Sequence, residues 1–157
     1  DISNMIQWVP NSNGHWQPIN NESVISKGIE LDTEIKTKIN NHNFLWNFQY
    51  SYTQSTSENT NLQLIYVPFH KATTLLNYQY KQFSYSLSGS YNGEVFTSTD
   101  NIFALKPYFL WNLQINYRYK KTKFNIAVEN ITNQYYQNVL NRPLPGRNFT
   151  IQINYQL

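Results

Sequence analysis

Few residues of this chain stand at spacings that would support catalysis or metal binding. The three histidines, His15, His42 and His70, are isolated from one another, so no pair has the spacing of metal ligands. Serine is frequent, but the chain has no Gly-x-Ser-x-Gly elbow and no defensible Ser-His-Asp order. It also has no cysteine, which excludes a disulfide framework and a thiolate metal site. We therefore expect no enzymatic activity, no catalytic residue, no metal site and no cofactor.

The only regular group of ionisable residues is acidic. Glu30, Asp32 and Glu34 stand at alternate positions, and alternate residues of a strand share one face. This spacing predicts an acidic strip that pairs with cations such as Arg118 or Lys123, rather than an acid–base pair.

The elements that would carry these residues are β-strands, and the last one is the clearest. In residues 148–157 one face is wholly apolar and the other is polar and uncharged. The apolar positions are Phe149, Ile151, Ile153, Tyr155 and Leu157. A bacterial outer-membrane β-barrel needs this pattern, because lipid contacts its outer face and water or protein fills its lumen.

The same period of two recurs along the whole chain, and no segment has helical periodicity. The predicted strands are 1–9, 20–36, 43–53, 71–81, 83–94, 109–119, 123–130 and 148–157, of which the first two alternate less strictly. Each is near or above the roughly 9–11 residues that cross a bilayer at a tilt. We therefore predict an all-β fold, a transmembrane antiparallel β-barrel wall with about eight strands in this chain.

The connections between these strands alternate between short and long. The short ones are 37–42, 81–82 and 120–122, and the long ones are 10–19, 54–70, 96–107 and 132–147. Outer-membrane barrels have short periplasmic turns and long extracellular loops. We therefore expect the long loops outside the cell and, from the even strand count, both chain ends on the periplasmic side. Lysines gather at the short turns, where solvation would also account for them, so we infer no function from them.

Composition and charge agree with this class. Aromatic residues make up 17% of the chain and include 13 Tyr, whereas charged residues are only 13%. The mean hydropathy of −0.59 and the lack of a long apolar run exclude a transmembrane helix. The net charge of +3 is scattered over turns and loops, so we expect no nucleic-acid partner.

Eight strands leave the barrel size open. A sheet in lipid must close, so the chain is either a small closed eight-strand barrel or an arc of a larger one. Small polar residues such as Ser84, Ser86, Ser88 and Ser90 line the polar face and suit a wide lumen. A stand-alone barrel for adhesion or anchoring, and a soluble all-β binding protein, remain as alternatives.

Several segments resemble the TonB-dependent outer-membrane receptors. Residues 128–136 read Val-Glu-Asn-Ile-Thr-Asn-Gln-Tyr-Tyr, and residues 142–149 read Arg-Pro-Leu-Pro-Gly-Arg-Asn-Phe before the closing strand. The N-terminal part of the chain resembles the family as well. The strand at 6–10, a loop with Asn20 and the Gly-Ile-Glu-Leu strand at 28–31 follow one another in the same order as in the family. The resemblance covers essentially the whole chain, although Leu157 stands where many such barrels end in Phe.

The resemblance implies that residues 1–157 are the C-terminal part of a 22-strand barrel and form its last eight strands. A plug domain, a TonB box and a signal peptide are expected to be absent from this chain. The implied partners are outer-membrane lipid, the rest of the barrel, the plug (which could also meet the acidic strip), TonB through the missing N-terminal region, and a small-molecule or metal-chelate ligand.

The implied function is energised uptake of a large, scarce nutrient such as an iron-siderophore, haem or cobalamin. The loop at 142–147 is most similar to that of cobalamin-type receptors in Bacteroidetes-like bacteria. The residues that carry the family motif are expected to be structural: Gly28, Glu30, Asn130, Asn133, Tyr136, Pro145, Gly146, Arg147 and Phe149.

Physical roles follow for some of these motif residues. Gly146 is expected to take a positive φ at the entry to the last strand, with Pro143 and Pro145 stiffening the approach. Arg147 is expected to bond loop carbonyls or Glu129, and Gly28 marks a bulge or a close strand approach.

The candidate ligand contacts lie on the predicted long loops. Rings there could stack on a planar ligand, and arginines could bind its carboxylates or phosphates. The candidates are Trp16, Tyr66, Phe69, His70, Glu94, Phe96, Arg142 and Arg147, although packing alone would also explain the aromatic ones.

Overall fold

The computed structural model describes residues 1–11 and 13–156. Long strands form its wall: β1 (Ile2–Pro10), β2 (Trp16–Ile39), β3 (His42–Ser57), β4 (His70–Tyr80), β5 (Phe83–Asn92), β8 (Tyr108–Tyr119), β9 (Thr122–Glu129) and β12 (Asn148–Tyr155). Short strands lie in the loops: β6 (Val95–Phe96), β7 (Ala104–Leu105), β10 (Gln137–Val139) and β11 (Arg142–Pro143). Leu157, expected to end the last strand, lies outside the described residues.

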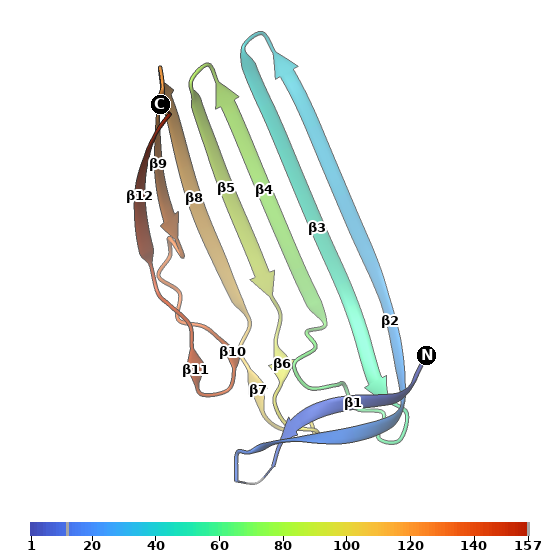
Figure 1. Ribbon diagram of the computed structural model, residues 1–157. Helices are drawn as coiled ribbons and strands as arrows, with labels where there is room; N and C mark the ends of the chain where they lie inside the picture. Colours follow the sequence, from blue (N-terminus) through green and yellow to red (C-terminus); the bar gives the residue numbers. More distant parts are fainter. Residues whose placement is uncertain (12, 157) are drawn as a thin grey trace.

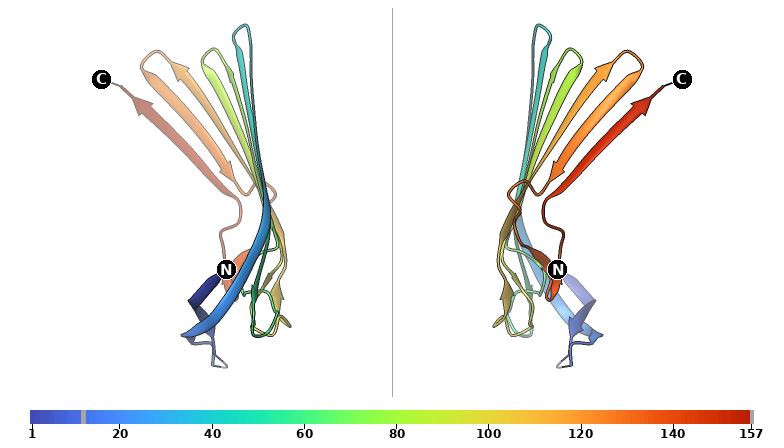
Figure 2. Two further views of the ribbon diagram at one scale, coloured as in Figure 1. Left: turned by 90° about the vertical axis from the view of Figure 1, so that its right-hand side faces the viewer. Right: turned by 90° about the vertical axis from the view of Figure 1, so that its left-hand side faces the viewer.

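The wall is one antiparallel sheet of eight strands in the order β1-β2-β3-β4-β5-β8-β9-β12 (Figure 1). This confirms the predicted all-β antiparallel fold. Within the described residues the sheet is open, because β1 pairs only with β2 and β12 pairs only with β9. Figure 2 shows that it is curved and strongly twisted, with β12 splayed away from β2.

Short turns gather at one end of the sheet and long loops at the other (Figure 1). The three short turns follow Ile39, Tyr80 and Tyr119, and their first residues Asn40, Lys81 and Lys120 have φ of 52°, 51° and 51°. This left-handed conformation lets a two-residue turn follow the twist of its strands.

The position of the N-terminal strand corrects one prediction. Both chain ends were expected at the short-turn end, and Tyr155 does lie there, opposite Thr122. Ile2 instead pairs with Val24, and β1 runs along the first third of the 24-residue β2, beyond the part that pairs with β3. The N-terminal end therefore lies towards the long loops, because β2 is long enough to extend past the wall and carry β1 there.

Burial is inverted relative to a water-soluble protein. On the wall, apolar side chains point outward and stay exposed, for example Ile29 at 69% and Ile151 at 75%. The buried apolar residues are Val9, Val24, Leu64, Ile65 and Val95. All of these lie at the long-loop end, so only that part of the described chain has a conventional core.

Aromatic rings form rows on the apolar face near both ends of the wall. Near the short turns, Phe83 lies 4.5 Å from Tyr117 and Phe44 lies 4.7 Å from Tyr78, ring centroid to centroid. At the other end, Phe109 lies 4.9 Å from Trp111. Rows of this kind fit the two headgroup levels of a bilayer, with the apolar band between them.

Two glycines on the wall mark close approaches. A Cβ on Gly28 would come 2.5 Å from the carbonyl oxygen of Tyr52. The β2–β3 register at Gly28 is unbroken. Of the two predictions for Gly28, the close strand approach is therefore confirmed and the bulge is wrong. A Cβ on Gly89 would come 2.5 Å from the ring of Trp111, the direct cross-strand partner of Gly89 on β8.

We predict that Gly89→Val destabilises the wall by about 1–3 kcal/mol, because the indole of Trp111 must leave its position. The measurement is the temperature at which the intact outer-membrane protein loses its folded migration on an unheated gel. Ser86→Val adds similar bulk on the same strand but faces an open groove, so its transition should barely change. Equal transitions for both variants would contradict this packing account.

Candidate functional site

The acidic strip on β2 bonds to amides rather than to arginine or lysine on β8 and β9. Asn47 Nδ2 donates to Glu34 at 3.0 Å, and Gln49 Nε2 donates to Asp32 at 3.1 Å. Lys36 Nζ lies 2.5 Å from Glu34, the one ion pair among the described residues. The expected pairing with Arg118 or Lys123 is therefore wrong.

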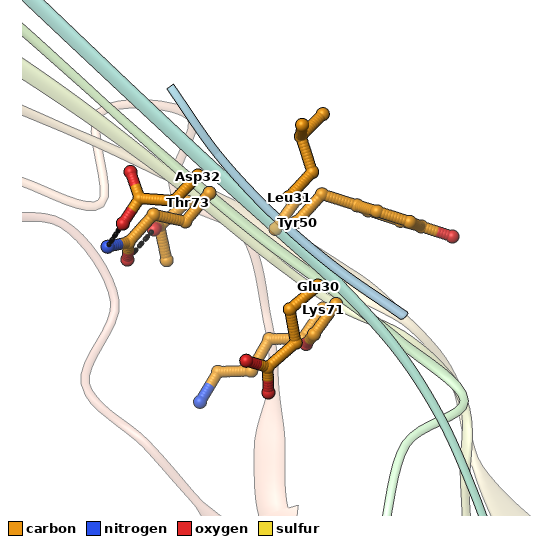
Figure 3. Close-up of a pocket in the computed structure, with 9 residues that line it drawn as sticks. Glu30, Leu31, Asp32, Tyr50, Lys71 and Thr73 are labelled. Carbon is orange, nitrogen blue, oxygen red and sulfur yellow. Dashed lines mark hydrogen bonds between the residues drawn. The ribbon is translucent and has the colours of Figure 1, made fainter. Parts of the chain in front are cut away.

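Figure 3 shows how the two faces of the wall separate near this strip. Asp32, Thr73, Glu30 and Lys71 point to one side, whereas Leu31 and Tyr50 point to the other. The polar side lines a hollow of about 330 Å³, in which Thr73 Oγ1 donates to Gln49 at 3.3 Å. The motif residue Glu30 thus lies on the polar wall.

At the long-loop end, Gln63 joins two loops. Its backbone N–H donates to Asn101 Oδ1 at 3.0 Å, and Asn101 Nδ2 returns a bond to the Gln63 carbonyl at 2.9 Å. The Gln63 side chain accepts from the Ser55 N–H at 2.8 Å and donates to the Val67 carbonyl at 3.2 Å. Gln63 is only 4% exposed, so these bonds satisfy a buried amide.

The loop between β6 and β7 is ordered by a carboxylate. Asp100 accepts from Ser98 Oγ at 2.5 Å and from the Ile102 N–H at 3.1 Å. The Ser98 hydrogen bond first, and the Ile102 N–H second, hold the pKa of the Asp100 carboxyl below its ordinary value. The side chains of Ile102 and Phe103, which directly precede β7, remain 72% and 66% exposed.

The motif residue Asn130 organises the loop that leads to the last strand. Its side chain accepts from the Gln134 N–H at 2.8 Å and donates to the Gln134 and Pro145 carbonyls at 2.9 and 3.4 Å. Asn130 is 4% exposed and has a φ of 49°, so it fixes the backbone from inside the loop.

A second asparagine fixes the end of the same loop. Asn133 Oδ1 accepts from the Arg147 N–H at 2.9 Å. A Cβ on Gly146 would come 2.7 Å from that oxygen. The positive φ expected for Gly146 is wrong, since Gly14 is the only described glycine with one. Lack of space explains this glycine instead.

The other motif residues lie around this loop. The Leu144 N–H donates to the Tyr136 carbonyl at 3.1 Å, and the Tyr136 ring lies 4.8 Å from that of Tyr108. Phe149 is 66% exposed on the apolar face. Within the described residues, no ion pair joins Arg147 to Glu129.

The aromatic ligand candidates form a connected group. Trp16 and Tyr66 have ring centroids 5.7 Å apart, and the Tyr66 N–H donates to the Phe96 carbonyl at 2.9 Å. Tyr66 has a φ of 59°, and its buried hydroxyl has no partner among the described residues. A strained residue with an unsatisfied polar atom is unusual outside functional sites.

Phe69 and His70 join this group to the apolar face. The Phe69 ring centroid lies 6.4 Å from that of Phe96, and His70 Nδ1 lies 2.8 Å from the Tyr50 hydroxyl. His70 begins β4 opposite Tyr52, so its position also suits the aromatic row. Glu94, Arg142 and Arg147 are exposed; Glu94 stands two residues before Phe96, whereas Arg142 and Arg147 lie on the segment between β9 and β12.

The sequence offered no signal for Gln63 or Asn101, because they are 38 residues apart in polar loops. The described residues contain no group of three His, Cys, Asp or Glu placed to hold a metal ion. No helix of the described chain is long and apolar enough to cross a membrane.

We predict that Gln63→Ala loosens the loop at 58–69, because the buried Ser55 N–H loses its acceptor. Such an unsatisfied group costs about 1–3 kcal/mol. The measurement is the rate at which an added protease cuts this loop on intact cells. Gln82→Ala, in an exposed short turn, is the control and should leave that rate unchanged. A normal rate for Gln63→Ala would contradict the joining role of Gln63.

We also predict a pH effect at the β6–β7 loop. Because the folded-state pKa of Asp100 is lowered, its bonds stabilise the loop above the ordinary pKa and are lost as pH falls through the lowered pKa. Ser98→Ala should raise the titration midpoint of the Asp100 carboxyl carbon, followed by NMR, towards the ordinary value. Thr99→Ala is the control, and a midpoint that Ser98→Ala leaves unchanged would contradict the assignment.

Comparisons with known proteins bear on the whole fold. A family model described as "TonB dependent receptor-like, beta-barrel" matches residues 1–131. The copper transporter OprC matches with a TM-score of 0.75 and 15% identity over 99% of this chain and 27% of its own. The ferric-catecholate import receptor Fiu from E. coli K12 matches with a TM-score of 0.70 and 17% identity, over 98% of this chain and 23% of its own.

The ferric yersiniabactin uptake receptor FyuA from Yersinia pestis matches less closely, with a TM-score of 0.55 and 12% identity over 95% of this chain and 31% of its own. At these identities the likeness concerns the fold. A search of curated proteins finds no match. The chain spans about a quarter to a third of the length of these structures.

The inverted burial and the alternating turns and loops thus agree with the family match, which covers most of the chain. TonB-dependent receptors are transporters of the bacterial outer membrane and not enzymes. This chain belongs to the TonB-dependent receptor family, as part of its β-barrel.

Proposed function

We propose that residues 1–157 are the C-terminal part of a barrel that takes up a large, scarce nutrient with energy supplied through TonB. The observation that carries this proposal is the open, inverted sheet. Along residues 25–39, the edge of β2 that faces away from β3 has no partner among the described strands, and neither has the outer edge of β12. Unpaired backbone groups do not persist in hydrocarbon, so further strands must complete the wall.

The sheet order and the exposure of the wall residues also argue against the two alternatives. A stand-alone eight-strand barrel would require β1 to pair with β12, whereas they lie at opposite ends of the sheet order. A soluble all-β protein would bury its apolar residues, whereas Ile151 and Ile29 are among the most exposed. The larger barrel is therefore the better account, with the remaining strands, a plug and TonB as partners.

The proposed ligand class is an iron-siderophore, haem or cobalamin. Among the similar structures, Fiu and FyuA are named as receptors for ferric chelates, and OprC as a copper transporter. The ring group of Trp16, Tyr66 and Phe96 at the long-loop end supports a planar or chelated ligand, because aromatic faces stack on such molecules. Arg142 and Arg147 would bind its acidic groups.

We predict that Trp16→Ala weakens ligand capture. The test measures binding and uptake of haemin, radiolabelled cyanocobalamin and a panel of radiolabelled ferric siderophores by cells that carry the full-length receptor, with and without a protonophore. The accepted probe should bind about tenfold more weakly to Trp16→Ala, a typical effect for a central aromatic contact.

The control is Tyr119→Ala, an exposed ring at the short-turn end, which should bind normally. Uptake that continues with the protonophore would contradict energised transport. Normal binding by Trp16→Ala, with intact uptake, would contradict the ring group as the ligand site while leaving the transport function in place.

A further inference from the structure

A row of rings crosses the apolar face of the wall next to the short turns. Its members are direct cross-strand partners on five neighbouring strands: His42 on β3, Tyr80 on β4, Phe83 on β5, Tyr117 on β8 and Phe124 on β9. Ring centroids lie 4.3 Å apart for His42 and Tyr80, and 4.5 Å apart for Phe83 and Tyr117. We call these five residues the short-turn ring row. Rings near the end of a barrel wall lie at the level of the lipid headgroups.

Two lysine ammonium groups lie beside this row. Lys81 Nζ is 5.1 Å from the ring centroid of Tyr80, and Lys120 Nζ is 5.5 Å from that of Tyr119. Tyr119 shares the apolar face with Tyr117, because residues two apart in a strand point to the same side. Both distances are within the roughly 6 Å of a cation–π contact. The two charges therefore lie on the membrane side of the wall, at headgroup level.

No acidic residue of the described chain neutralises these charges. The hairpin segments 77–86 and 114–125 contain no Asp or Glu, and the one ion pair among the described residues, Lys36–Glu34, is on β2. At the tip of β8 and β9 is a hollow of about 390 Å³ with no acidic lining residue. Its basic lining residues are Arg118, Lys120, Lys121 and Lys123. Because these like charges repel one another, an anion bound beside them would be stabilising.

We propose that the short-turn ring row, with Lys81 and Lys120, binds one cardiolipin molecule of the periplasmic leaflet. This phospholipid carries two phosphates joined through one glycerol. The β4–β5 and β8–β9 turns are two strand spacings apart, which is about 10 Å. A phosphate oxygen accepts from an ammonium at about 2.8 Å. Two linked phosphates therefore meet both lysines at once, whereas a headgroup with one phosphate meets only one of them.

The wall beside the ring row suits the acyl chains of this lipid. Leu76, Leu87 and Leu113 are successive cross-strand partners on β4, β5 and β8, and Leu76 is 45% exposed. Leu76 is four residues from Tyr80 along β4, or about 13 Å towards the middle of the wall. A small soluble anion would contact the lysines but not this leucine strip, so the combination favours a lipid.

This lipid site is separate from nutrient uptake. It requires that the apolar face contacts the membrane and that the short turns lie at the periplasmic side, as in other outer-membrane barrels. It does not require any particular ligand at the long-loop end.

The test uses the full-length receptor, purified in a mild detergent and mixed with equal amounts of three lipids. These are tetraoleoyl cardiolipin, dioleoyl phosphatidylglycerol and dioleoyl phosphatidylethanolamine. Native mass spectrometry then counts the lipids that stay bound to each receptor. We expect one cardiolipin to be retained in preference to the other two. Equal retention of all three lipids, or a preference for either lipid with a single phosphate, would overturn the proposal.

Removing the two charges tests where the lipid binds. The double variant Lys81→Gln, Lys120→Gln should bind cardiolipin about 25-fold more weakly, because a lysine close to an anionic membrane surface contributes about fivefold in affinity. The matched control is Lys36→Gln, Lys38→Gln, which removes the same charge at the same end of the wall but from the polar face. The control should retain cardiolipin as the unaltered receptor does.

Folded migration on an unheated gel checks that each variant is intact. Unchanged cardiolipin binding in the Lys81, Lys120 variant, or an equal loss in the control, would overturn the proposed site. Neither outcome bears on nutrient uptake, which is tested by ligand binding at the opposite end of the wall.

Discussion

The rest of this structure depends on one constraint: a backbone within hydrocarbon must satisfy every N–H and C=O internally. The eight-stranded antiparallel sheet satisfies these groups between its neighbouring strands. With the backbone paired, side chains alternate between lipid on one face and polar surroundings on the other. The exposed Ile, Leu and aromatic residues of the wall would be unfavourable in water, but in the membrane they contact lipid and stabilise the fold.

The same constraint divides the chain into two regimes. Across the wall, stability comes from strand pairing and outward apolar contact, and the polar face can stay open. Beyond the wall, at the long-loop end, the chain returns to water and builds a conventional core around Val24 and Ile65. Buried amides such as Gln63 and Asn130 there replace strand pairing, because irregular loops must satisfy their backbone groups with side chains.

The strand periodicity of the wall could be predicted from sequence because alternate residues of each strand face lipid and the polar side, and their residue types differ accordingly. The alternation in 43–53 or 148–157 is of this kind, and the turns between strands follow from it. The position of β1 could not be predicted, since it depends on how far β2 extends past the wall. The Gln63–Asn101 bonds also gave no signal, because they depend on two loops meeting in space. The reason for a glycine at position 146 also could not be predicted. The sequence suggests a positive φ, whereas the glycine is needed because the side chain of Asn133 leaves no room for a Cβ.

The central claim is that the apolar face of this sheet contacts lipid and the polar face does not. The most direct measurement is a nitroxide scan along β3 of the full-length protein in outer membranes, with oxygen and a water-soluble nickel chelate as relaxing agents. We predict that Phe44, Trp46 and Phe48 positions respond to oxygen, whereas Leu45, Asn47 and Gln49 positions respond to the chelate. Chelate access at both sets of positions, or no alternation between them, would contradict the account.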